Sequence, residues 1–104
     1  MAIIKGVFLL PLKDNDGSDL IPEITEAIQA VYDRFRGWTR EGRVTGAFRV
    51  EDGAPKLDEC EKYMVFFDEA RVHELEQVLQ SFKAKTTQEA IYLELQRHVE
   101  IRLL

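Results

Sequence analysis

Hydrophobic and polar positions follow two different periods along this chain, and the period changes several times. Residues 3–12 form a continuous apolar run rich in β-branched residues, which predicts a buried strand that ends at the polar turn 13–18. After this turn the apolar positions fall three or four apart, so they share one face of a predicted helix that runs to about Arg36. Gly37 follows at once, and a glycine there can cap the helix.

Two later segments again show the alternation of apolar and polar residues, or the β-branched and aromatic residues, that is typical of strands. Residues 44–50 alternate, and residues 62–67 form a second aromatic and β-branched run. The stretch between them contains the turn residues 51–55, so the two runs predict an antiparallel hairpin with a long connection. Asp68 can cap a second helix over about 69–83, whose apolar residues again repeat at helical spacing.

The last twenty residues allow two interpretations. Apolar positions alternate over 91–95 and again over 99–103, which predicts two short strands joined by a turn at 96–98. The alternative is a third helix, because residues 86–89 could form a capping box.

The predicted order is β-α-β-β-α-β followed by an extra C-terminal strand, within a single α+β domain that covers residues 1–104. This is the split βαβ order of the ferredoxin-like plait, an antiparallel sheet with both helices on one face. Over nearly its whole length the chain resembles this α/β plait. The stretches 35–39 (FRGWT) and 46–48 (GAF) are also similar to small uncharacterised bacterial proteins of unknown function. That second resemblance implies no catalytic residue.

The central strands are predicted to be apolar on both sides, although two helices can cover only one. In the first strand Ile3, Val7 and Leu9 point one way, and Ile4, Phe8 and Leu10 point the other. A half-solvated antiparallel sheet normally alternates apolar and polar residues, so we expect the open face to be covered. A second copy, an apolar ligand or the segment 99–104 could cover it. The leading hypothesis is a homodimer through the open sheet face, since isologous dimers are the commonest oligomers.

Composition and charge narrow the class of protein. The 104 residues are 45% hydrophobic and 32% charged, which is typical of one ordered, soluble domain. The net charge of −5 argues against a nucleic-acid partner, because such proteins neutralise phosphates with a basic surface. Lys5 interrupts the apolar N-terminal run, which favours a strand over a signal peptide or a membrane span. The single cysteine, Cys60, fits a reducing cytoplasm, and its acidic neighbours are expected to raise its pKa.

The best candidate site surrounds the only tryptophan, between the first helix and the second strand. Arginine binds anions with a fixed fork of donors, and nearby glycines allow close backbone approach, so this segment could bind an anionic small molecule. The candidate ligand-binding residues are Trp38, Thr39, Arg40, Glu41, Arg43 and Tyr63. The plainer interpretation is that Trp38 seals one end of the core and the arginines are solvated.

Metal and cofactor sites are not expected. Residues 14–17 (DNDG) with Glu23 partly resemble a calcium loop, but Leu12 would occupy the first ligand position. His73 and His98 lie far apart and have no zinc-ligand spacing around them.

Two functional interpretations remain open. The first is a dimeric cytoplasmic module that binds a ligand or partner. The second is a small dimeric enzyme acting on an anionic or aromatic metabolite, in which Arg40, Arg43 and Glu41 orient the ligand and Tyr63 or His73 carries the proton. Fold alone does not choose between them.

Overall fold

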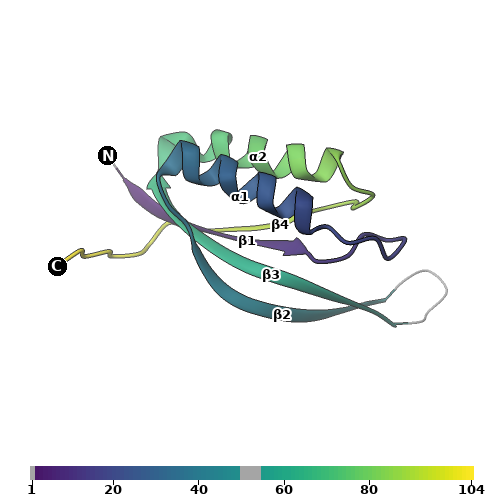
Figure 1. The fold of residues 1–104 in the computed structure, drawn as a ribbon. Coiled ribbons are helices and arrows are strands. Elements are labelled where there is room, and N and C mark those ends of the chain that lie inside the picture. Colours follow the sequence, from purple (N-terminus) through teal and green to yellow (C-terminus); the bar gives the residue numbers. More distant parts are fainter. Residues whose placement is uncertain (1, 50–54) are drawn as a thin grey trace.

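The computed structural model describes residues 2–49 and 55–104, which form a four-stranded antiparallel sheet with two helices on one face (Figure 1). The elements in chain order are β1 (Ile3–Pro11), α1 (Ile21–Phe35), β2 (Thr39–Arg49), β3 (Pro55–Asp68), the 3-10 helix η1 (Glu69–Arg71), α2 (Val72–Ala84) and β4 (Tyr92–Gln96). The strand order is β2-β3-β1-β4. The predicted ferredoxin-like plait is confirmed.

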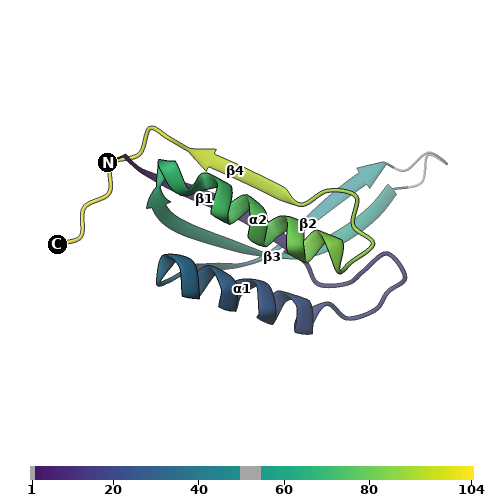
Figure 2. The same ribbon diagram turned by 90° about the horizontal axis from the view of Figure 1, so that it is seen from above.

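The core lies between the sheet and the two helices, which run side by side above it (Figure 2). Every second residue of β1, including Ile4, Phe8 and Leu10, points toward the helices and is buried. Gly6 shares that face. A Cβ there would lie 2.9 Å from Leu75 Cδ2 and 2.9 Å from a ring carbon of Phe67, so a glycine is what lets α2 approach the sheet.

Both helices are amphipathic. Helix α1 buries Ile24, Ala27 and Val31, whereas Tyr32 on its outer side is 54% exposed. The left-handed residue that ends α1 is Arg36, with φ 64°, and not Gly37 as predicted. No helix in the described ranges has both the length and the apolar character needed to cross a bilayer.

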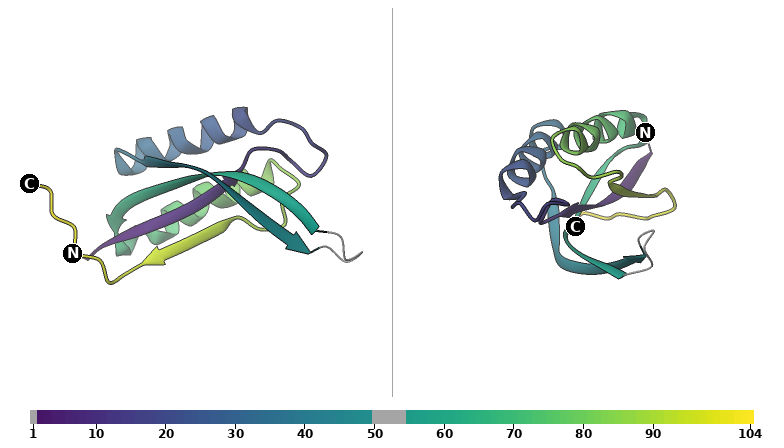
Figure 3. Two further views of the ribbon diagram at one scale, coloured as in Figure 1. Left: turned by 90° about the horizontal axis from the view of Figure 1, so that it is seen from below. Right: turned by 90° about the vertical axis from the view of Figure 1, so that its right-hand side faces the viewer.

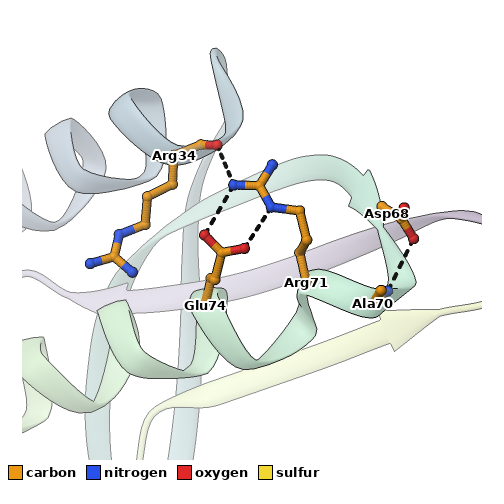
Figure 4. A network of polar contacts seen from close by, with 5 residues as sticks. All are labelled: Arg34, Asp68, Ala70, Arg71 and Glu74. Carbon is orange, nitrogen blue, oxygen red and sulfur yellow. Dashed lines mark hydrogen bonds and ion pairs between the residues drawn. The ribbon is translucent and has the colours of Figure 1, made fainter.

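Arg71 joins the end of α1 to the start of α2 (Figure 4). Its Nε donates to Glu74 at 2.6 Å and its Nη2 donates to the backbone carbonyl of Arg34 at 2.7 Å. The guanidinium also lies 4.7 Å above the ring of Phe35. Asp68 caps η1 by accepting from the amide of Ala70 at 3.1 Å, as its position before the helix predicts.

The hairpin of β2 and β3 is longer than predicted and extends past the helices (Figures 1 and 3). Strand β2 begins at Thr39 and not at residue 44 as predicted. Residues 39–43 are mostly polar, but they pair with β3. An edge strand can be polar, so hydrophobic alternation did not identify this part. A β-bulge between Arg40 and Gly42 inserts one extra residue, Glu41. Residue 50 of the predicted strand and residues 51–54 of the predicted turn 51–55 lie outside the described residues, whereas Pro55 begins β3.

The C-terminal region confirms one of the two short strands predicted there and contradicts the other expectations. The predicted strand at 91–95 is confirmed as β4, one residue later at Tyr92–Gln96, and it pairs with β1, so the helix alternative for residues 86–97 is wrong. The extra strand at 99–103 is also wrong, because residues 97–104 leave the end of the sheet and do not turn back along β4 (Figure 3). An alternating segment forms a strand only where it finds a hydrogen-bonded neighbour.

Candidate functional site

Tyr63 is the centre of the Trp38 region and is only 2% exposed. Its ring stacks on Phe8 with a centroid distance of 5.6 Å and an interplanar angle of 19°. Trp38 meets the same ring edge-on, at 5.6 Å and 85°. Trp38 is 39% exposed, so it covers Tyr63 on one side and presents its other side to solvent.

Two arginines of β2 lie on the same side of the sheet as Tyr63. Arg40 lies opposite Tyr63 in the pairing of β2 with β3. Arg43 pairs with Glu61, and its Nε lies 3.2 Å from Glu61 Oε1. The Arg43 side chain remains 67% exposed, whereas that of Glu61 is 11% exposed. This side of the hairpin therefore presents two guanidinium groups, one of which already has a carboxylate partner.

Burial raises the pKa of Tyr63, and the charge of Glu61 raises it further, against the opposing effect of Arg40. Tyr63 therefore keeps its proton at neutral pH. Its hydroxyl can donate a hydrogen bond or a proton to a bound group, but it is unsuited to act as a base.

Glu41 lies on the opposite face of the sheet from Arg40 and Arg43, because the bulge changes the alternation at this point. Its carboxylate lies 3.9 Å from Lys5 Nζ and 3.6 Å from Lys62 Nζ. The structure thus brings Trp38, Arg40, Arg43 and Tyr63 together and separates Glu41 from them.

Thr39 lies at the end of the sheet, opposite Met64. It lines a hollow of about 300 Å³ together with Gly37, Trp38, Met64 and Phe66, and we call this the end hollow. Phe35 and Val65 complete its lining. None of these side chains titrates near neutral pH.

The open face of the sheet contains a second hollow, of about 270 Å³, which the sequence interpretation missed. Four strands line this hollow. The lining residues include Val7 and Leu9 of β1, Val44 of β2, Cys60 and Lys62 of β3, and Tyr92 of β4. Val7 is 3% exposed although both α1 and α2 lie on the opposite face of the sheet (Figure 3). We call this surface the open-face hollow.

The open face also carries charged residues of both signs, among them Lys5, Lys62 and Glu94. Tyr92 donates from its hydroxyl to Glu94 at 3.0 Å, and Gln96 donates to the same carboxylate at 2.7 Å. These two hydrogen bonds lower the pKa of Glu94, as do the positive charges of Lys62 and Lys5.

The prediction that the open face is apolar is therefore only partly right. Lys5 shares a face with Ile3 and Val7, as its alternation with them in the sequence already indicated.

Cys60 lines the open-face hollow, and burial followed by the charge of Asp58 raises the pKa of its thiol. A raised pKa makes a thiolate scarce at neutral pH, which disfavours a nucleophilic role.

The candidate residues for a metal site or for proton transfer, Asp14 and His73, make contacts within the fold. Asp14 accepts hydrogen bonds from Thr87 and Gln88, which ties the β1–α1 loop to the α2–β4 loop and lowers the pKa of Asp14. His73 is exposed on α2 and contacts Gln77 at 3.2 Å. Within residues 2–49 and 55–104, no three His, Cys, Asp or Glu side chains are grouped as metal ligands.

Comparison with known proteins shows that this chain is similar in fold to solved structures. No family model and no curated protein matches the chain. CutA1 from Oryza sativa has a similar structure, with a TM-score of 0.65 and 10% identity over 96% of this chain and 83% of that one. The divalent ion tolerance protein CutA1 from Ehrlichia chaffeensis has a TM-score of 0.61 and 9% identity, over 97% and 85% of the two chains. The resemblance to small bacterial proteins stays a prediction, and at these identities the neighbours establish that the chain has their ferredoxin-like plait fold.

Proposed function

We propose that this chain is a self-associating binding module, in which a second copy covers the open face of the sheet. The observation that carries the proposal is the open-face hollow, an apolar depression on the side of the sheet opposite both helices. Apolar surface gathered in one place on a sheet face is typical of an interaction site.

The charges around the hollow favour a second copy as the occupant. Lys5 and Lys62 carry positive charge on this face, and Glu41 and Glu94 carry negative charge. In a two-fold symmetric contact each residue meets the partner's matching region, so lysines of one copy can approach carboxylates of the other. A surface that carries both signs is complementary to itself in a way that a uniformly charged surface is not.

Sedimentation equilibrium of two tyrosine variants tests the proposal. Tyr92→Asp places a charge at the rim of the open-face hollow, whereas Tyr32→Asp places the same charge on the outer side of α1. Both tyrosines are 54% exposed, so the two variants are matched in residue type and burial. We expect wild type and Tyr32→Asp to associate at micromolar concentration and Tyr92→Asp to weaken association at least tenfold. A monomeric wild type, or equal association of all three proteins, would contradict the proposal.

We also propose that the Trp38 region binds a small anion through Arg40 and Arg43. The specific observation is that two guanidinium groups share one face with the protonated Tyr63 hydroxyl. Carboxylates and phosphates accept hydrogen bonds from such groups. An enzyme acting on an anionic or aromatic metabolite would use the same groups, with Tyr63 as a proton donor.

A thermal-shift screen with phosphate and a panel of small carboxylates tests this site. A ligand that binds the native state raises its apparent stability by mass action. We expect a hit to stabilise wild type and the control Arg102→Ala, and to lose its effect in Arg40→Ala. A hit that stabilises Arg40→Ala equally would place the anion elsewhere.

A further inference from the structure

The C-terminal segment 99–104 belongs to no strand of the described sheet, although Val99 and Ile101 are partly buried. Arg97 anchors its beginning, since Nε of Arg97 lies 2.5 Å from Glu69 Oε1. Beyond that point Leu103 is 95% exposed and Leu104 is fully exposed. Val99, Ile101 and Leu103 alternate with Glu100 and Arg102, which is the pattern of a strand with one apolar side.

One stretch of the sheet lacks a neighbouring strand at the same end of the molecule. The pairing of β2 with β3 begins at Thr39 opposite Met64, whereas β1 continues alongside β3 as far as Asp68. Residues 65–68 of β3 therefore have a paired strand on one side only. An unpaired edge presents backbone donors and acceptors to another chain.

The end hollow adjoins this unpaired edge. Trp38 and Phe66 line it, and each is 39% exposed. The C-terminal segment leaves the sheet at this same end and extends outward beyond it (Figures 1 and 3). A donor segment and an acceptor site thus lie at the same end of one molecule, an arrangement that two copies can satisfy reciprocally.

We propose that residues 99–104 of one copy add as a strand to residues 65–68 of a second copy, and that Ile101 and Leu103 fill the end hollow. Backbone hydrogen bonds would supply affinity and the alternate apolar side chains would supply specificity, as in other strand additions.

Charge also fits this arrangement. Arg36 is exposed next to Gly37 of the hollow, and Asp68 ends the acceptor strand, so Glu100 and Arg102 each have an opposite charge within the acceptor region. The proposal extends the self-association proposed above but uses a different surface, so the two can be tested separately.

Trp38 provides the readout, because it is the only tryptophan and lines the end hollow. The experiment compares wild type with a variant that lacks residues 99–104. We expect the wild-type emission to shift to the blue as concentration rises, and the truncated protein to show no concentration dependence. Adding a synthetic peptide of residues 97–104 should restore the shift with saturation, and the same peptide carrying Leu103→Asp should not.

Two outcomes would overturn the proposal. An emission that is the same in both proteins at every concentration, with no response to the peptide, would show that the segment does not reach Trp38. A difference that is independent of concentration would place the segment in the hollow of its own chain.

The open-face variant keeps this result distinct from the proposed function. If only the open-face association fails, Tyr92→Asp associates like wild type while truncation still abolishes the shift. If only the strand addition fails, truncation leaves the sedimentation behaviour unchanged and Tyr92→Asp still weakens association.

Discussion

Single residues decide how closely the layers of this fold approach. Gly6 is an example, since its missing side chain leaves room for Leu75 and Phe67. The sequence predicted that Ile4 and Phe8 share one face of the first strand, and Gly6 alternates with them onto that face. It could not show that α2 would lie directly above Gly6, because that contact depends on how two distant segments pack.

Gly6→Ala is expected to destabilise the protein by roughly 1–3 kcal/mol, because the added methyl group overpacks a filled core. Chemical denaturation of wild type and variant measures the difference. Gly37→Ala is the matched control, since a Cβ there meets no atom within 4 Å and its φ is not positive. Equal stability of Gly6→Ala and wild type would mean that α2 does not approach the sheet as closely as described.

At the scale of elements, hydrophobic periodicity predicted the strands and helices whose faces are buried. It identified β1, both helices, β4 and residues 62–67 of β3. It missed residues 55–61 of β3 and residues 39–43 of β2, where the strand lies at the edge and carries polar residues. It also could not predict the bulge at Glu41, so it grouped Glu41 with the two arginines of the candidate site. Hydrophobic periodicity indicates which side chains are buried. It therefore cannot predict a strand that is exposed on both faces.

Arg71 connects elements that the sequence shows only as separate helices. Its contacts with Glu74, with the carbonyl of Arg34 and with the Phe35 ring hold the end of α1 against the start of α2 (Figure 4).

We expect Arg71→Ala to lower the thermal unfolding midpoint by a few degrees. Arg71→Lys should recover only part of the loss, because lysine retains the charge but lacks the planar fork. In circular dichroism melting curves, the unfolding midpoint should be highest for wild type, lower for Arg71→Lys and lowest for Arg71→Ala. A lysine variant as stable as wild type would indicate that charge alone matters at this position.

At the scale of the whole molecule, both helices cover one face of the sheet, and neither covers the other face. The sequence predicted this asymmetry from the order of its elements. It overestimated how apolar the open face is, because the count of apolar positions in the central strands left out Lys5 and Lys62, which share that face with Val7 and Met64.

Covering the open face should protect Cys60, the only cysteine, which lines the open-face hollow. We expect alkylation of Cys60 to slow as protein concentration rises through the association range. The reaction should be followed at mildly alkaline pH, because burial raises the pKa of the thiol and only the thiolate reacts. Tyr92→Asp, which weakens the proposed contact, should show a rate independent of concentration. A wild-type rate that is equally constant would mean that the hollow stays open.

The bulge at Glu41 also determines where this chain tolerates a change in length. Loss of Glu41 would convert the bulge into a regular ladder and leave every later side chain of β2 on its present face. Loss of Thr45 would instead move the rest of the strand to the opposite face, bringing Ala47 to the open side. Among natural or engineered sequences with this fold, one-residue deletions in this strand should therefore accumulate at the position of Glu41.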